Sequence, residues 1–369
     1  MPKVITHLII GLGLGGAETM LYQILANREI DFNKHKIISL GIGNFYEKPI
    51  SELGIEVITL PIKQRPLYTF FMLKRLTADT DTLCCWMYHA NLLGYFAFLK
   101  NNNRKLIWNI RHSNLDLDKN KRTTLLINKI CSKLSNKVDL VIYNGETARK
   151  IHEAVGYKPK LSLVLENGCD LEKFKPIPNA NCYIRKMLGI GENKKIILSI
   201  ARDVPIKDLP TFINAFSRVH RVIHDSVAVM CGQGIDNNNV KLRTNLEKVG
   251  LLIGQDVYLL GLRQDIPILL NGCDVFVLHS AGEAFPNVLI QAMACECICV
   301  TTDVGEAKTI LADNAFTVEP KNPFDLANAI LRALLIDSKQ AETIRKNNRC
   351  RVRKLYDIKN VFKKYEELF

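Results

Sequence analysis

The sequence predicts an α/β protein built from two doubly wound, Rossmann-like domains in series. Short β-branched apolar runs alternate with longer amphipathic segments, an order typical of parallel sheets with helices on both faces. The pattern restarts after the polar stretch Lys175–Ala180. A chain of 369 residues also exceeds one ordinary core and fits two domains.

The elements follow in order from their hydrophobic pattern. Strands are expected at Val4–Ile10, Lys36–Leu40, Leu106–Ile110, Leu140–Tyr143, Ile196–Ile200, Ser226–Cys231, Val257–Leu260, Val275–Leu278 and Cys297–Thr301. Helices are expected at Ala17–Ala26, Thr123–Leu134, Thr211–Arg221, Val240–Val249 and Pro286–Ala294. Domain bounds are expected at residues 1–176 and 177–349, with residues 350–369 as a final helical segment.

Composition and charge favour some classes of partner and exclude others. The net charge of +13 favours an anionic partner, which could be nucleic acid, an acidic lipid surface or a phosphorylated substrate; plain solvated surface charge is the alternative. No nucleic-acid module signature accompanies the charge, so nucleic-acid binding is not expected. No apolar run is long enough to span a membrane, and the start of the chain is interpreted as a first strand and not as a signal peptide.

Cysteine usage indicates a cytoplasmic protein. The chain has 11 cysteines, an odd number without disulfide-framework spacing, as expected of small hydrophobes in a reducing compartment. Cys295, Cys297 and Cys299 alternate along an expected strand, which would put all three on one face. No CxxC pair or histidine cluster accompanies them, so core packing is the expected role and no metal site is expected.

The stretch SAGEAFPNVLIQAMA offers a phosphate site. Pro286 suits the first position of a helix, which would then present backbone N–H groups around Phe285–Val288 to an anion. Glu283 precedes this helix, and Gln291 lies more than one turn into it. One of these side chains could hold sugar hydroxyls and the other a ribose. A capped core helix with an exposed Glu is the alternative.

Two cations follow the strand KKIILSI: Arg202 directly after it and Lys207 five residues further on. Cations at the carboxyl end of a strand are placed to neutralise a diphosphate leaving group, although ordinary surface charge is the alternative.

Near the start of the chain, Gly11, Gly13 and Gly16 fit G-x-G-x-x-G, but the acidic residue expected near position 40 is absent. The helix start at Gly15 and Gly16 would still let backbone approach a phosphate or sugar. His89 and His112 each follow an apolar strand, and His112 is the stronger candidate.

Taken in order, these pieces resemble the family-4 glycosyltransferases of the GT-B fold, in which two Rossmann-like domains face each other across a cleft, and especially bacterial members that build surface polysaccharides. The similar segments are GGAE, WMYHANLLG, IRHSNLDLDKNKRTT, ENGCDLEKFKP, ARDVPIKDLPTF, MCGQG, GLRQDIPILLNGCDVFVLHS and GEAFPNVLIQAMAC with TTDVG. Together they cover nearly the whole chain.

The resemblance implies retaining, metal-independent transfer of a sugar from a nucleotide-sugar, usually UDP-linked, to a lipid-linked or growing glycan acceptor in lipopolysaccharide, O-antigen or capsule synthesis. It implies a peripheral enzyme on the cytoplasmic face of the inner membrane, with the acceptor on the N-terminal domain and residues 350–369 packed back on that domain. The implied catalytic residues are Glu283, Arg202, Lys207 and His112. The implied donor-binding residues are Gly15, Gly16, Phe285, Pro286, Asn287, Val288, Gln291 and Arg263.

Three residues depart from the family pattern. Gln291 stands where the family has a second Glu that accepts bonds from both ribose hydroxyls, and Glu296 and Ile298 replace the usual Gly and Pro. An altered turn after the helix is therefore expected. A catalytically degenerate nucleotide-sugar binder is the alternative function, and a nucleotide-sugar epimerase of the same fold is a further one.

Overall fold

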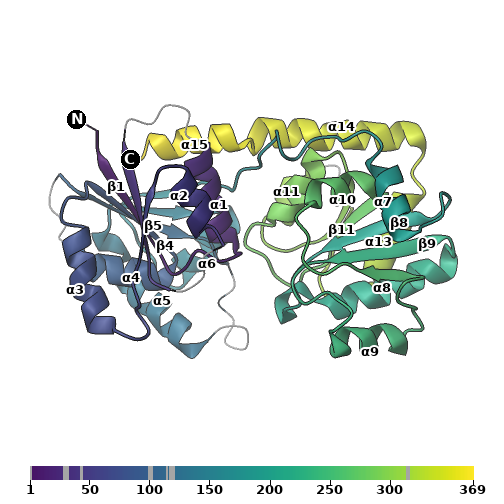
Figure 1. Cartoon of the computed structure of the whole chain (residues 1–369), viewed down its shortest axis with the longest axis horizontal. Coiled ribbons are helices and arrows are strands. Elements are labelled where there is room, and N and C mark those ends of the chain that lie inside the picture. The colour runs from purple at the N-terminus through teal and green to yellow at the C-terminus, as the bar shows by residue number, and fades with distance from the viewer. Residues whose placement is uncertain are drawn as a thin grey trace. The chain divides into compact units, whose positions relative to one another are not determined.

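The computed structural model describes residues 2–27, 33–41, 45–98, 103–113, 115, 121–312 and 316–369, so residues 114 and 116–120 of the motif IRHSNLDLDKNKRTT lie outside it. The chain divides into two compact units, each with its own parallel sheet (Figure 1). Unit 1 comprises Met1–Gly168 and Ile358–Phe369, and unit 2 comprises Cys169–Asp357. No helix among the described residues is long and apolar enough to cross a membrane.

Unit 1 is built on a seven-stranded parallel sheet with the order β3-β2-β1-β4-β5-β6-β7. Its strands are β1 (Val4–Ile9), β2 (Lys34–Ser39), β3 (Glu56–Thr59), β4 (Thr82–Trp86), β5 (Lys105–Ile110), β6 (Leu140–Tyr143) and β7 (Ser162–Val164). Its helices are α1 (Gly16–Ala26), α2 (Glu47–Glu52), α3 (Pro66–Leu76), α4 (Tyr88–Ala97), α5 (Arg122–Leu134), α6 (Glu146–Ala154) and α15 (Ile358–Glu366), with a 3₁₀ turn at Ser135–Lys137.

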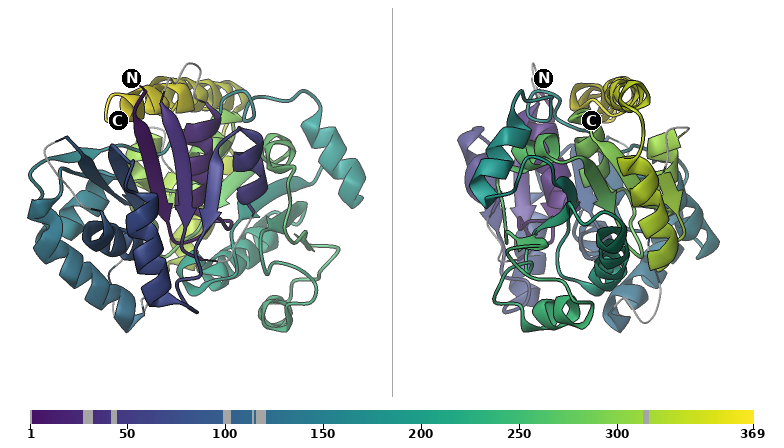
Figure 2. Two further views of the ribbon diagram at one scale, coloured as in Figure 1. Left: turned by 60° about the vertical axis from the view of Figure 1, so that its left-hand side comes forward. Right: turned by 90° about the vertical axis from the view of Figure 1, so that its right-hand side faces the viewer.

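Alternating side chains along the strands of unit 1 pack into two separate hydrophobic cores, one on each face of the sheet. On one face, Ile5, Ile9 and Trp86 pack with α1, α2 and α15. On the other, Leu8, Cys85 and Trp108 pack with residues of α3, α4, α5 and α6. The strands are buried on both faces, which explains why they read as continuous apolar runs. Figure 2 shows this sheet with helices on its two sides.

Unit 2 is built on a six-stranded parallel sheet with the order β10-β9-β8-β11-β12-β13. Its strands are β8 (Lys195–Ile200), β9 (Ser226–Cys231), β10 (Val257–Leu259), β11 (Val275–Leu278), β12 (Ile298–Thr302) and β13 (Phe316–Val318). Its helices are α7 (Ala180–Leu188), α8 (Leu209–Val222), α9 (Val240–Lys248), α10 (Ile266–Gly272), α11 (Asn287–Ala294), α12 (Ala307–Leu311), α13 (Pro323–Leu334) and α14 (Ser338–Leu355), with a 3₁₀ turn at Pro205–Lys207.

This sheet too is covered on both faces. Strand residues such as Leu198 and Phe276 pack with α7, α10, α11 and α12, whereas Ile197 and Val277 pack with α8, α9 and α13. The strand order is that of a Rossmann fold, in which the chain reverses direction across the sheet between its first and fourth strands. The predicted fold class, a GT-B protein with two Rossmann-like domains, is confirmed.

The last helix, α15, belongs to unit 1, where it packs against α1 and supplies Tyr365 to the core. The guanidinium of Arg111 donates to the Tyr365 hydroxyl, to the Asn167 side chain and to Asn109 Oδ1 at 3.1 Å. It also lies over the Trp86 ring, 5.0 Å from the ring centre. Arg111 is thus a buried structural cation that fastens the end of the chain to β4 and β5.

Several expectations need correction. The helix predicted from Pro286 begins at Asn287, with Pro286 as its N-cap. Strands β3, β7 and β13 were not predicted; all three are short edge strands whose residues are mostly not buried, so they lack a strong apolar run. Of the three alternating cysteines, only Cys299 lies in a strand: Cys295 caps α11 and Cys297 lies in the following turn. All three are buried in one core, which agrees with the packing role.

Replacing Tyr365 with Phe should lower the unfolding free energy of unit 1 by about 1–3 kcal/mol, since the buried Arg111 and Asn109 each lose a hydrogen-bond partner. Both tryptophans lie in unit 1, so urea unfolding followed by tryptophan fluorescence reports on that unit. Tyr68→Phe, at a half-exposed position on α3, is the matched control and should change stability little. Equal stability of the two variants would contradict a stabilising role for the hydrogen bonds of the Tyr365 hydroxyl.

Candidate functional site

The carboxyl ends of β8 and β11 form the topological switch point of unit 2. These two strands are paired neighbours, while the chain leaves β8 toward α8 and leaves β11 toward α11. Ligands of open α/β sheets bind in the crevice that such a divergence leaves at the strand ends. The two loops that follow these strands carry Lys207 and Glu283.

Lys207 and Glu283 form an ion pair that joins the two loops. Both side chains are mostly buried, with 19% and 12% of their surfaces exposed, so water screens the pair less than it would on an open surface. Lys207 closes the 3₁₀ turn Pro205–Lys207, and the left-handed Asp208 then starts α8. The two predicted catalytic side chains, 76 positions apart, are therefore in direct contact.

Neighbouring hydrogen bonds hold the Glu283 loop in place. Ser280 Oγ donates to Glu283 Oε1 at 2.6 Å, and Thr302 Oγ1 donates to the Ser280 carbonyl at 2.7 Å. The amide of Ala281 donates to the Ile206 carbonyl at 2.8 Å, which ties this loop to the Lys207 turn. Gly305 has a positive φ of 54°, and a Cβ there would overlap the Glu283 carbonyl oxygen, so only glycine fits. The Glu283 loop is accordingly held by the Ser280 hydroxyl, by the backbone bond to Ile206 and by its close packing on Gly305.

His279 is a buried neutral histidine beneath the Lys207 turn. Its Nε2 lies 2.7 Å from Ser199 Oγ, and its ring stacks on Phe212 of α8 with 4.9 Å between centres. Burial lowers the pKa of His279 to about 4, and the ring faces the backbone of Lys207 and Asp208. The ring connects the ends of β8 and β11 to the first turns of α8, and so supports the turn that positions Lys207.

The remaining predicted residues of unit 2 lie around this pair. Arg202 is exposed at the end of β8, and among the described residues its side chain makes no hydrogen bond or ion pair. The first turn of α11 follows Glu283 and leaves backbone N–H groups without intrahelical partners, which is the arrangement that binds anions. Phe285 is buried with its ring against Tyr356, whereas Val288 and Gln291 are partly exposed on α11.

The turn that follows α11 keeps its left-handed residue despite the loss of glycine. Glu296 has a φ of 61°, its amide donates to the Met293 carbonyl, and the Cys297 amide donates to Ala292 at 3.0 Å. These two bonds are the Schellman arrangement, in which glycine is the usual residue. The expected altered turn is therefore not altered in its backbone, and Glu296 adopts a conformation that costs a non-glycine residue about 1 kcal/mol.

Arg263 already has a partner. Its guanidinium makes a two-point contact with Asp265, with Nε 2.8 Å from Oδ1, and this contact raises the pKa of Arg263. A donor phosphate would have to compete with that carboxylate. The predicted role of Arg263 in donor binding remains a prediction.

Three predicted residues belong to unit 1. Gly15 caps α1 and Gly16 begins it, at the carboxyl end of β1, and the carboxylate of Glu18 folds over Gly15. His112 follows β5 and lies 6.3 Å, centre to centre, from the Tyr88 ring. Gly15 and Gly16 stand at the switch point of their own sheet, where β1 and β4 are neighbours, and His112 follows β5, the next strand beyond β4.

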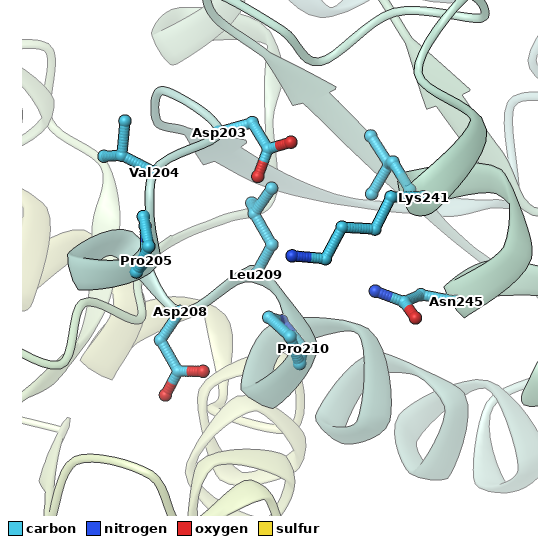
Figure 3. A pocket seen from close by; sticks show the side chains of 9 residues that line it. Asp203, Val204, Pro205, Asp208, Leu209, Pro210, Lys241 and Asn245 are labelled. Carbon is cyan, nitrogen blue, oxygen red and sulfur yellow. The ribbon is translucent and has the colours of Figure 1, made fainter.

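A cavity of about 330 Å³ adjoins the Lys207 turn on the side of α9. It is lined by Asp203, Val204, Pro205, Asp208, Leu209, Pro210, Lys241, Leu242 and Asn245. Figure 3 shows the ammonium of Lys241 pointing into it. Neither Lys207 nor Glu283 lines this cavity, so we place the candidate site at their ion pair and at the strand ends.

The residues that position the predicted pair were not predicted from the sequence: Ser199, His279, Ser280 and Thr302. Their signal was available: each is a polar residue at the carboxyl end of an apolar strand, the place where ligand and support residues collect. No cluster of three or more His, Cys, Asp or Glu side chains suited to a metal occurs within the described part of the chain.

Residues 183–351, nearly all of unit 2, match the family model of glycosyl transferases group 1. A relative from Escherichia coli, UDP-Gal:alpha-D-GlcNAc-diphosphoundecaprenol alpha-1,3-galactosyltransferase, is 28% identical over 56% of this chain and 53% of its own length. A relative from Campylobacter jejuni, N-acetylgalactosamine-N,N'-diacetylbacillosaminyl-diphospho-undecaprenol 4-alpha-N-acetylgalactosaminyltransferase, is 25% identical over 95% of both chains.

Solved structures share the fold along the whole chain. Anabaena HepE in complex with UDP and glucose superimposes with a TM-score of 0.84, at 22% identity over 99% of both chains. WaaG, a glycosyltransferase involved in lipopolysaccharide biosynthesis, superimposes with a TM-score of 0.75, at 15% identity over 99% of both chains. At these identities the likeness establishes the fold.

The pH dependence of stability should depend on His279. Its pKa is about 4 in the folded protein and 6.5 for the free side chain, so as pH falls below 6.5 the unfolded chain takes up a proton first and folding is disfavoured. Between pH 7 and 4.5 the wild type should lose about 2–3 kcal/mol more unfolding free energy than His279→Gln. Scanning calorimetry across this pH range measures the difference.

The matched control is His224→Gln, at an exposed histidine of the same unit, which should keep the wild-type pH dependence. Parallel pH curves for the wild type and His279→Gln would contradict a buried neutral ring at this position.

Proposed function

From the match of residues 183–351 to the family model of glycosyl transferases group 1, we propose that the chain transfers a sugar from a UDP-sugar to a lipid-linked saccharide with retention of configuration. The observation that carries the proposal is the contact between Lys207 and Glu283 at the switch point of unit 2. It holds a cation and a carboxylate beside the first turn of α11, in the unit that matches the family model.

The proposed roles follow from charge. When the bond between the sugar and the donor phosphate breaks, negative charge develops on the departing diphosphate, the acceptor hydroxyl oxygen forms the new bond to the sugar, and the hydroxyl proton passes to an oxygen of the departing diphosphate. Arg202, Lys207 and the amides at the start of α11 stabilise the diphosphate, and Glu283 contacts the sugar. Losing one such preorganised group costs about 3–4 kcal/mol, or roughly 10²–10³ in rate. With these fixed charges, we propose a reaction independent of metal ions.

The names of the relatives support the acceptor class. Those from Escherichia coli and Campylobacter jejuni act on saccharides linked to diphospho-undecaprenol, and the first uses UDP-galactose. We accordingly propose an undecaprenol-diphosphate-linked acceptor, a role in lipopolysaccharide, O-antigen or capsule assembly, and a place at the cytoplasmic face of the inner membrane. The net charge of +13 suits an anionic surface of this kind.

A nucleotide-sugar binder without catalytic activity is the second candidate, and Gln291 favours it. Gln has one neutral acceptor oxygen where a carboxylate would grip both ribose hydroxyls, so donor binding by this side chain should be weaker. Gln291→Glu separates the candidates: an active enzyme should bind its donor more tightly and keep turning over, whereas an inactive binder should gain affinity and still release no product.

Glu283→Ala should reduce turnover at least about 10²-fold while the fold stays intact. A thermal-shift screen of UDP-sugars first identifies the donor, and release of UDP in the presence of undecaprenol-diphosphate-linked saccharide then measures turnover, with and without EDTA. Glu247→Ala, at an exposed position of α9, is the control and should behave as wild type. Near-normal turnover of Glu283→Ala, or loss of turnover with EDTA that added divalent ions restore, would refute the corresponding role.

Removing both cations, as Arg202→Ala with Lys207→Ala, should weaken UDP binding at least about 10²-fold, because each supplies a charged partner to the diphosphate. Isothermal calorimetry with UDP measures the affinity. Arg243→Ala with Lys248→Ala removes two exposed cations of α9 at equal change of net charge. If both double variants bind UDP equally well, Arg202 and Lys207 do not hold the diphosphate.

A further inference from the structure

One helix of unit 1 exposes apolar side chains that its core does not use. On α3 (Pro66–Leu76), Leu67 is 74% exposed, Tyr68 48% and Phe71 66%. The opposite side of the helix is already apolar and packed: Thr69 and Leu73 are buried, and Phe70, Met72 and Leu76 pack against the core. The exposed side is thus a second apolar surface on a helix whose structural role is complete without it.

Cations surround this surface without acidic partners. Lys63 and Arg65 precede the exposed residues, and Lys74 and Arg75 follow them. The sequence contains no Asp or Glu from Val57 through Ala78, and within the described ranges none of the four cations forms an ion pair. The exposed side of α14 differs, because there Lys346 pairs with Glu342. The α3 surface (Leu67, Tyr68 and Phe71 with Lys63, Arg65, Lys74 and Arg75) therefore combines exposed apolar groups with uncompensated positive charge.

Exposed apolar groups flanked by cations are complementary to the surface of a bilayer that contains anionic lipids. A helix that lies in the plane of a bilayer presents aromatic and leucine side chains to the boundary between headgroups and acyl chains, while Lys and Arg contact lipid phosphates. A protein partner would satisfy the apolar groups, but only a surface dense in anions also matches four cations on either side of them. The long aliphatic parts of Lys and Arg let their charges reach headgroups while the ring of Phe71 lies deeper.

We propose that the α3 surface docks unit 1 on a bilayer containing anionic lipids. The inference deepens the proposed function, since it names the element that would bring the enzyme to a membrane-held acceptor, but its test needs neither donor nor turnover. The neighbouring helices α4 and α5, which lie in the same helical layer as α3, carry the exposed Phe96 and Leu126 (Figure 1).

Co-sedimentation with vesicles tests the proposal. The wild type should bind vesicles of equimolar phosphatidylcholine and phosphatidylglycerol, bind pure phosphatidylcholine much more weakly, and lose binding as salt rises. Two variants separate the contributions: Leu67→Ser with Tyr68→Ser and Phe71→Ser removes the apolar groups, and Lys63→Gln with Arg65→Gln and Arg75→Gln removes charge. Each should weaken binding to the anionic vesicles about 10- to 100-fold.

The control is Leu252→Ser with Phe324→Ser and Leu335→Ser, three exposed apolar positions of unit 2, which should bind vesicles like the wild type. UDP affinity should be unchanged in all variants, so that a failure of docking is distinguished from a failure of the proposed function. Wild-type binding retained by both α3 variants would overturn the proposal. So would a concentration-dependent dimer in ultracentrifugation that only the serine variant of α3 abolishes, because a second copy would then cover the surface.

Discussion

The ion pair between Lys207 and Glu283 is the contact on which the candidate site depends. It joins the loops that leave two neighbouring strands in opposite directions, and so fixes the place where unit 2 is open to a ligand. Every support found around it acts on one of these two loops: Ser280 and Thr302 on the carboxylate side, His279 and Ile206 on the ammonium side. The pair also holds the Lys207 ammonium at the carboxyl ends of the strands.

The fold could be predicted from the sequence because parallel strands that are buried on both faces appear as short continuous apolar runs. The residues of the candidate pair were also predictable, since each lies in the loop that follows such a run, and these loops start at the carboxyl edge of the sheet. The details that failed were of another kind. Cys295 and Cys297 follow the alternation of a strand but lie in a helix cap and a turn, because the Schellman bonds after α11 hold Glu296 and Cys297 in the turn and β12 begins only at Ile298.

Long-range partners could not be predicted from pattern. Arg111 and His112 are adjacent in the sequence and both follow β5, yet Arg111 is buried against Tyr365, which lies 254 positions away in the chain, while His112 is partly exposed. Nothing near Arg111 indicates that partner. In the same way, the resemblance implies donor binding by Arg263, but nothing in the pattern predicts that its guanidinium contacts Asp265 two residues later. The charge of a residue does not by itself distinguish a cation that binds a ligand from a cation that makes a structural contact within the protein.

The assignment of α15 to unit 1 has a consequence for how the chain is made. A ribosome completes all of Cys169–Asp357 before it delivers Tyr365, so the buried guanidinium of Arg111 waits for its hydroxyl acceptor throughout the synthesis of unit 2. During that interval α1 and α2 can already pack on this face of the first sheet, but the apolar side chains that α15 covers stay exposed. Unit 1, although its first residues are synthesised earliest, therefore completes its core only after unit 2 has been synthesised, and it exposes apolar surface to aggregation until α15 packs.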